Sequence, residues 1–275
     1  MPTTPPQFRH LLPEPGLRVR RSSPAAADWS ALALSPAGWY RADTGLYQER
    51  TGAAATTPAL LLSDPVGTWQ DRTPHGRHLV AATDASRASL HLGLQNDLPG
   101  VRLDGADDRL INAALGALFA GTDVPHTLVY VSRSNTPAAT FQAETLLYHS
   151  GAGLAFEAIY NAATATGMTF SRRDDTGLNE IIPTFTDDRS TFRILEIAFT
   201  GTAVSIRRNG AAVLTDATVD VGAFTVDRFA VGGGPVSGFF LGDILELLVF
   251  EGVLAAEDAT LLRAYLGTRY LIEVA

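Results

Sequence analysis

The sequence predicts an all-β protein, a sandwich of two antiparallel sheets with a C-terminal helix and an extended N-terminal arm. Three observations support this fold class. The 275 residues include 25 glycines and 15 prolines, which separate many short extended runs. Strands do not alternate with helices in the way that builds a parallel sheet. Only one long stretch has strong helical periodicity, and it lies near the C-terminal end.

The expected strands are short runs rich in apolar, β-branched and aromatic residues. They are residues 38–42, 66–70, 79–82, 101–103, 127–132, 145–149, 154–160, 168–172, 192–199, 203–208, 211–214, 228–231 and 239–250. Asn209 and Gly210 supply the two positive-φ positions of a type I′ turn, so the runs on either side of them form a hairpin. The last run is apolar on both faces, which predicts a central strand covered partly by the terminal helix.

The C-terminal helix is expected over residues 254–270. Its apolar residues recur at near-helical spacing, and the resulting stripe is expected to pack on the core. Glu257 and Asp258 lie near its start and Arg269 near its end, which suits the helix dipole. Residues 115–119 predict one further, short helical turn.

Two stretches are expected to be long surface loops. Residues 51–65 are rich in alanine and threonine and carry no charge before Asp64. Residues 172–189 contain charges of both signs. We expect the second stretch to be solvated and self-neutralising, in preference to a binding site.

The first 28 residues differ from the rest, so we divide the chain into an arm, residues 1–28, and a domain, residues 29–275. Six prolines favour an extended conformation in the arm. Four arginines outnumber its two acidic residues, which leaves +2 on the arm and −10 on the remainder. We expect the arm to dock on a partner subunit rather than to remain a free tail, since a terminus is ordered only when it is held. The docking arginines are Arg9, Arg18, Arg20 and Arg21.

Composition excludes several classes of protein. The absence of cysteine excludes disulfides, thiolate zinc sites and a cysteine nucleophile. A net charge of −8 argues against a nucleic-acid binder, and binding of nucleic acid or heparin by the arm is the least favoured alternative. Glu246 and Glu251 interrupt the longest apolar stretch near the end, so no membrane insertion is expected. No apolar run follows the arginines, so no signal peptide is expected.

Five sequence blocks occur in a fixed order. They are GWYRAD (38–43) with VGTWQD (66–71), PGVRLDGADDRL (99–110), RNG (208–210), FLGDILE (240–246) and the terminal helix. Together they resemble laminin G-like, concanavalin A-like jelly-roll domains over residues 36–272. The resemblance implies a two-sheet jelly roll. Ala255 stands where the family has a serine at the helix start, so a cap worth about 1 kcal/mol is missing. The segment after Asp43 is longer than the family's usual turn.

The resemblance also implies a function. A lone jelly roll with a proline-rich arm and no secretion signal resembles phage virion components such as capsid decoration proteins, head fibres and tail adhesins. We therefore expect a non-enzymatic structural protein of a phage or phage-like particle, made in the host cytoplasm and located in the virion. Its expected partners are other virion subunits, further copies of itself and a cell-surface glycan. The alternatives are a carbohydrate-binding, lectin-like module of a cellular protein and, less favoured, a glycoside hydrolase.

No catalytic residues are expected. A glycoside hydrolase needs two carboxyl groups on one face. Asp243 and Glu246 are three residues apart on one strand, which predicts opposite faces. Asp216 and Asp220 share a face but have no aromatic neighbours in the sequence. The six histidines fall in no recognisable motif, and no nucleophile elbow, P-loop or zinc-protease motif occurs.

Calcium is the favoured metal, although no cofactor is required. Asp104, Asp107 and Asp108 place three carboxylates within five residues, and Gly105 permits a tight turn. Carboxylate oxygens suit calcium, and the resemblance implies a calcium ion at a loop rim. The alternative, which we weigh more heavily, is that these aspartates only hold the turn by Asx hydrogen bonding.

For Asp71 and the tryptophans, a structural role and a binding role are again the two alternatives. Asp71 is expected to form an Asx turn rather than to bind a metal. Trp29, Trp39 and Trp69 could stack on sugars. Trp39 and Trp69 lie in strand motifs, so core packing is expected for both.

Overall fold

The computed structural model describes residues 30–136, 142–151, 156–161, 167–177, 179–219, 222–234 and 238–275. The predicted arm, including Arg9, Arg18, Arg20 and Arg21, lies outside the described residues, as do Trp29 and Asp220. The division into an arm and a domain therefore stays a prediction.

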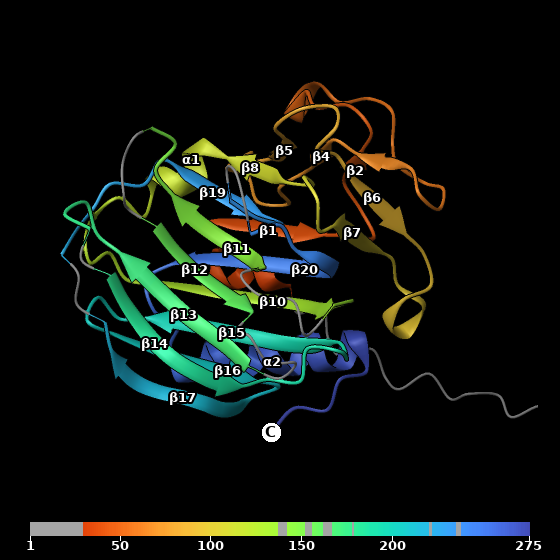
Figure 1. The fold of residues 1–275 in the computed structure, drawn as a ribbon. Helices are drawn as coiled ribbons and strands as arrows, with labels where there is room; N and C mark the ends of the chain where they lie inside the picture. The colour runs from red at the N-terminus through yellow and green to blue at the C-terminus, as the bar shows by residue number, and fades with distance from the viewer. Residues whose placement is uncertain are drawn as a thin grey trace, which may run out of the picture. The chain divides into compact units, whose positions relative to one another are not determined.

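Two large antiparallel sheets form the sandwich, as predicted (Figure 1). Sheet A contains, in spatial order, β17 (Ala211–Thr218), β16 (Ala203–Arg208), β15 (Arg193–Phe199), β10 (His126–Ser134), β20 (Leu241–Glu251), β7 (Gly100–Asp104), β6 (Ala88–His91) and β3 (Pro65–Val66), with β1 (Gly38–Arg41) also paired to β20. Sheet B contains β14 (Asn179–Thr186), β13 (Gly167–Arg173), β12 (Phe156–Asn161), β11 (Ala143–Tyr148), β19 (Arg228–Val231), β8 (Leu110–Asn112), β5 (Leu79–Ala81), β4 (Thr68–Trp69) and β2 (Leu46–Tyr47). A small ribbon pairs β9 (Gly121–Thr122) with β18 (Ala223–Phe224).

Helical structure is sparse in the described part of the chain. There are three short 3-10 helices, η1 (Ala31–Leu34), η2 (Gly52–Ala54) and η3 (Gln95–Asp97), and two α-helices, α1 (Ala113–Ala117) and α2 (Ala256–Tyr270). Both predicted helices are therefore present. Among the described residues, no helix has the length and apolar character needed to cross a bilayer.

Helix α2 covers the outer face of sheet A and lies behind it in Figure 1. The buried Glu246 of β20 joins the helix to the sheet, because it accepts hydrogen bonds from Tyr270 Oη at 2.8 Å and from Trp39 Nε1 at 2.7 Å. Ala255 offers no side-chain cap, as the sequence predicted. At the other end of the helix, Gln95 donates to the Tyr270 carbonyl at 2.7 Å and satisfies one of the unpaired carbonyl groups there.

Several strands differ from the prediction. Residues 66–70 divide between β3 in sheet A and β4 in sheet B, because the chain crosses from one sheet to the other at Gly67. The strands that were not predicted are β2, β6, β8, β9, β14 and β18. The prediction of a solvated surface loop at residues 172–189 is wrong. Strand β14 occupies much of this stretch, and Arg172, Asp187 and Arg189 are buried.

The centre of the sandwich is apolar, but two ionic clusters are buried at the ends of β10. In the first ionic cluster, Glu157 of sheet B lies 2.7 Å from His126 Nε2 of sheet A and 2.6 Å from Arg172 Nη1. His126 Nδ1 faces the Val124 carbonyl oxygen at 3.1 Å. Both ring nitrogens thus meet oxygen acceptors, and both contacts are hydrogen bonds only when each nitrogen carries a proton. Arg172 stacks between Phe199 and Phe224 at 4.3 and 3.8 Å from the ring centroids.

The second ionic cluster centres on Arg193 of sheet A. Its guanidinium lies 2.7 Å from Glu144 and 2.6 Å from Asp187, and it donates to the Ser132 hydroxyl at 2.9 Å. The Arg193, Glu144 and Asp187 side chains are fully buried. Arg208 also reaches Asp187, at 2.8 Å. Each cluster therefore joins the two sheets across the core.

Candidate functional site

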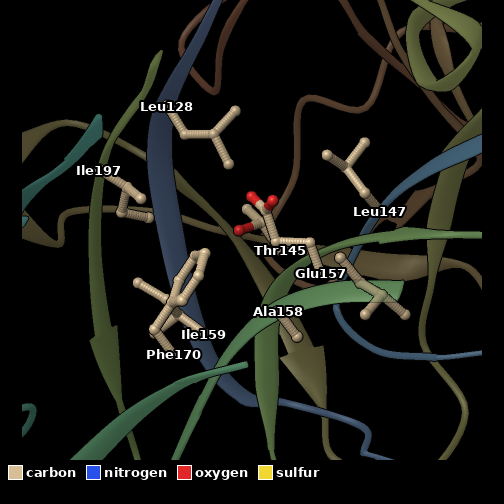
Figure 2. Close-up of a pocket in the computed structure, with 9 residues that line it drawn as sticks. Leu128, Thr145, Leu147, Glu157, Ala158, Ile159, Phe170 and Ile197 are labelled. Carbon is tan, nitrogen blue, oxygen red and sulfur yellow. The ribbon is translucent and has the colours of Figure 1, made fainter. Parts of the chain in front are cut away.

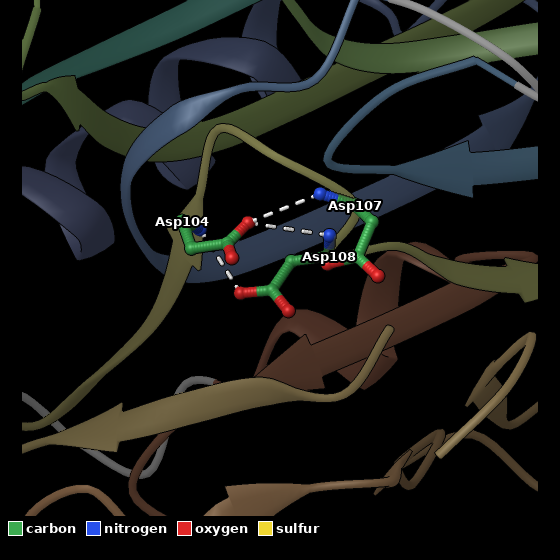
Figure 3. Close-up of side chains that lie close together, drawn as sticks. All are labelled: Asp104, Asp107 and Asp108. Atoms are coloured by element: carbon green, nitrogen blue, oxygen red, sulfur yellow. Dashed lines mark hydrogen bonds between the residues drawn. The ribbon is translucent and has the colours of Figure 1, made fainter. Parts of the chain in front are cut away.

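The predicted metal ligands lie together in the turn after β7 (Figure 3). One oxygen from each of Asp104, Asp107 and Asp108 lies within 4.8 Å of the others. Asp104 Oδ1 accepts the backbone N–H groups of Ala106 at 2.8 Å and Asp107 at 3.2 Å, and the Asp104 N–H donates to Asp108 Oδ2 at 2.9 Å. This is the hydrogen bonding of an Asx turn.

The acidic turn has mixed exposure. Asp104 and Asp107 are exposed, whereas Asp108 is buried. Burial, followed by the neighbouring charge of Asp104, raises the pKa of Asp108 to about 7. With one oxygen from each, the three carboxylates supply fewer than the six to eight oxygens that calcium takes, so carbonyl groups or water would have to complete a site here. Calcium binding stays a prediction.

Asp71 and two of the tryptophans have structural roles. Asp71 accepts hydrogen bonds from the backbone N–H groups of Trp39, Thr73 and Arg77, each at 3.0 Å, so its carboxylate is fully engaged in holding the chain. Trp39 and Trp69 are buried, as expected for core packing.

The carboxylates of β20 correct a prediction. Strand β20 contains a bulge, because Val131 is opposite Glu246 while the next residue, Ser132, is opposite Ile244. The extra residue places Asp243 and Glu246 on the same face, so the prediction of opposite faces is wrong. Asp243 is bound by Arg102 at 2.7 Å, and Glu246 by the contacts to α2 and β1 described above. Both carboxylates are therefore occupied by structural partners.

The interior of the sandwich has no room for a ligand at the cavity in Figure 2. The cavity lies between the two sheets and measures about 10 Å³. Glu157 and Thr145 place oxygen atoms toward it, and Leu128, Leu147 and Ile197 surround them. This volume is at the lower limit for a single water molecule.

A larger opening lies on the surface, at the end of the sandwich that carries β2, β4 and β5. We call it the polar groove. It has a volume of about 470 Å³ and is lined by Gln48, Glu49, Arg50, Thr51, Thr57, Asp84 and Arg87. Two chain segments build it: the one that follows β2 and runs through η2, and the turn between β5 and β6. The sequence offered one signal for it, the long segment after Asp43.

Hydrogen bonds hold the two guanidinium groups of the polar groove in place. Arg50 donates to the carbonyl groups of Ala81 at 3.2 Å and Ala82 at 3.0 Å, and its Nε lies 2.8 Å from Asp84. Arg87 donates to the Asp84 carbonyl at 3.0 Å and to the Gln48 carbonyl at 3.2 Å. The protein itself thus holds both guanidinium groups in place.

The two carboxylates of the polar groove remain ionised at neutral pH. The Thr57 side chain hydrogen-bonds Glu49 and lowers the pKa of that carboxyl group, and the Thr57 N–H donates to the same carboxylate at 3.0 Å. The hydrogen bond from Arg50 lowers the pKa of Asp84. The groove therefore presents fixed donors beside ionised acceptors.

Comparison with known proteins identifies the fold. No family model matches the sequence, and no curated protein matches it. Among solved structures, the chain is similar to the binding domain of Paraclostridial Mosquitocidal Protein 1, with a TM-score of 0.52 and 12% identity over 75% of this chain and 52% of that one. It is also similar to the botulinum neurotoxin serotype D binding domain, with a TM-score of 0.52 and 11% identity over 86% and 53% of the two chains.

A third similar structure is the receptor binding domain of a botulinum neurotoxin C/D mosaic serotype, with a TM-score of 0.51 and 10% identity over 74% of this chain and 50% of that one. The chain spans about half the length of each of these domains. At such low identity the likeness is one of fold. This chain therefore shares a β-sandwich fold with domains that serve in binding.

Proposed function

We propose that this chain is a non-catalytic binding module that holds a carbohydrate in the polar groove. The observation that carries the proposal is the set of fixed, charged side chains in that groove: two guanidinium groups beside two ionised carboxylates. The likeness to the fold of toxin binding domains supports a binding role.

The chemistry of the groove suits a polyhydroxylated ligand. Each sugar hydroxyl both donates and accepts a hydrogen bond. Glu49 and Asp84 accept, Arg50 and Arg87 donate, and the Gln48 amide does both. A guanidinium group offers two parallel donors and a carboxylate two acceptors, so each can bind two neighbouring hydroxyls on a sugar ring. Hydrogen bonds to such charged groups are stronger than those between neutral groups. The volume of about 470 Å³ lies within the range of small-molecule sites.

The same groove does not favour the glycoside hydrolase alternative. A glycosidase needs a carboxylic acid that is protonated near its working pH, so the pKa of that group is raised. The pKa values of Glu49 and Asp84 are both lowered. The carboxylates of the groove are thus suited to bind hydroxyl groups rather than to donate a proton.

A glycan array probed with the full chain tests the proposal, followed by titration calorimetry with the glycan that binds. Glu49→Gln keeps the shape of the side chain but removes its charge. We expect it to weaken binding about five- to tenfold, because a hydrogen bond to a charged group contributes roughly 1.5–3 kcal/mol and a neutral one roughly 0.5–1.5 kcal/mol. Glu257→Gln, an exposed position on α2, is the matched control and should leave affinity unchanged. Equal losses in the two variants, or an array without a bound glycan, would contradict the proposal.

We also propose, as a second candidate, that the module belongs to a phage or phage-like particle, made in the host cytoplasm and held in the virion by its arm. The arm's four arginines and six prolines favour this reading. Deleting residues 1–28 should abolish assembly on the particle and leave the melting temperature of the domain unchanged. Normal assembly of the shortened chain would show that the arm is not the anchor.

A further inference from the structure

Three consecutive leucines are exposed in the segment that follows the polar groove. We call Leu60, Leu61 and Leu62 the leucine turn; their exposed fractions are 67%, 69% and 60%. Leu92, at 48%, lines the same surface hollow as Leu60. These four make up half of the eight large apolar side chains that are exposed in the described part of the chain. A concentration of this kind marks an interaction surface.

Four backbone N–H groups between residues 60 and 64 are hydrogen-bonded within the protein. The N–H groups of Leu60 and Leu61 both donate to the Asp64 carboxylate at 2.8 Å. The N–H of Ser63 donates to the Leu90 carbonyl at 2.8 Å, and that of Asp64 to the Leu61 carbonyl at 3.0 Å. These donors therefore need no water and no partner. Unpaired donors make the transfer of a turn into an apolar medium costly, and these four N–H groups avoid that cost while the charged Asp64 carboxylate stays at the level of the lipid headgroups.

Charge distinguishes between the surfaces that the turn could enter. Residues 51–63 carry no charged side chain, while the whole chain has a net charge of −8. A surface of anionic lipid would repel the protein, whereas an uncharged surface would not. A second copy of the chain, also at −8, would meet the same repulsion.

We infer that the leucine turn inserts into the surface of an uncharged lipid bilayer. This insertion requires no membrane-spanning segment. The absence of a long uninterrupted apolar stretch in the sequence therefore does not argue against it. Burial of the leucine side chains drives the insertion, while the charged Asp64 carboxylate stays at the headgroup level and accepts the N–H groups of Leu60 and Leu61. Because Thr57 and Leu60 are close in the chain, an inserted turn would bring the polar groove near the lipid headgroups.

Sedimentation of the full chain with phosphatidylcholine vesicles tests the inference. These vesicles carry no sugar, so the result is independent of glycan binding in the polar groove. The double variant L61S/L62S should lower the partition coefficient by at least about tenfold, because two exposed leucines lose their transfer free energy. Leu261→Ser, at an exposed leucine on α2, is the matched control and should bind as the wild type does.

Two further measurements identify the mechanism. Asp64→Ala keeps all three leucines but removes the acceptor of two N–H groups, so it should also weaken vesicle binding. Vesicles that contain phosphatidylserine should bind less of the wild type than phosphatidylcholine vesicles do. The inference is wrong if the wild type does not sediment with phosphatidylcholine vesicles or if L61S/L62S binds them equally well. It is also wrong if sedimentation equilibrium shows that the leucines instead join two copies of the chain.

Discussion

Replacing Arg193 by methionine should destabilise the protein more than any surface change does. The Arg193 guanidinium is fully buried, and it is bound to Asp187 at 2.6 Å, to Glu144 at 2.7 Å and to the Ser132 hydroxyl at 2.9 Å. Burial alone would lower the pKa of this guanidinium, but the two carboxylates more than offset it and raise the pKa above its ordinary value. Methionine fills a similar space and leaves two buried carboxylates without their shared cation.

The expected loss follows from the geometry of the second ionic cluster. Removing one member of a buried ion pair costs about 3–5 kcal/mol, because a charge remains uncompensated in the core. For a domain of this size, each kcal/mol lowers the melting temperature by roughly 2–4 °C, so a fall of about 6–20 °C is expected. Urea unfolding followed by circular dichroism measures the free energy directly.

Two variants act as controls for Arg193→Met. Adding Glu144→Gln and Asp187→Asn to it removes the stranded charges and should recover about 2 kcal/mol. Arg228→Met breaks a half-exposed pair with Asp227, at 3.3 Å, and should cost less than about 1 kcal/mol. The reasoning is refuted if Arg193→Met unfolds within about 1 kcal/mol of the wild type, or if the triple variant is less stable than the single one.

Four other predictions concern stability. Gly210→Ala should cost about 1–3 kcal/mol in urea unfolding, because Gly210 has a φ of +86° and a Cβ there would lie 2.6 Å from the Ala275 carbonyl oxygen; no loss would show that the turn can relax. Ala255→Ser supplies the missing cap of α2 and should raise stability by about 0.5–2 kcal/mol, and an unchanged urea midpoint would count against a capping role. Glu157→Gln should destabilise the protein most at neutral pH. Burial raises the pKa of Glu157, but the larger combined effect of His126 and Arg172 leaves that pKa below its ordinary value. The stabilisation by Glu157 is therefore present above about pH 4 and is lost as the pH falls through the folded-state pKa. A loss that does not depend on pH would contradict this sign. Calcium should raise the melting temperature and EDTA lower it if Asp104, Asp107 and Asp108 hold an ion, and the absence of any shift would remove the calcium prediction.

Local signals were enough to predict most of the fold. The Asn209–Gly210 turn lies between β16 and β17, with φ angles of 49° and 86° at the two residues, as a type I′ turn requires. Apolar runs also located most of the long strands, because strand burial leaves a pattern in consecutive residues. The eight-residue β14 is the exception, since it lies in the stretch that was expected to be a charged surface loop. Strands of three or four residues, such as β6 and β8, are too short to leave that pattern.

Long-range pairing explains what the sequence did not reveal. Arg172 looks like a surface charge in the sequence, and it is buried because Glu157 and two phenylalanine rings surround it in the fold. The bulge in β20 changes the face of Glu246 without leaving any local signature. The polar groove combines residues near 50 with residues near 85, so only the length of the segment after Asp43 could have suggested it.

We expect the two ionic clusters to favour one alignment of the sheets over its neighbours. Successive side chains on a strand point to opposite faces, so a slip of β10 by one residue would turn both His126 and Ser132 out of the core. Glu157 and Glu144 would then each lose a partner while still buried. A purely apolar core would tolerate such a slip more readily, because one aliphatic side chain can replace another. In a chain without cysteine, we thus expect the buried charges to penalise misaligned states more than they stabilise the native one.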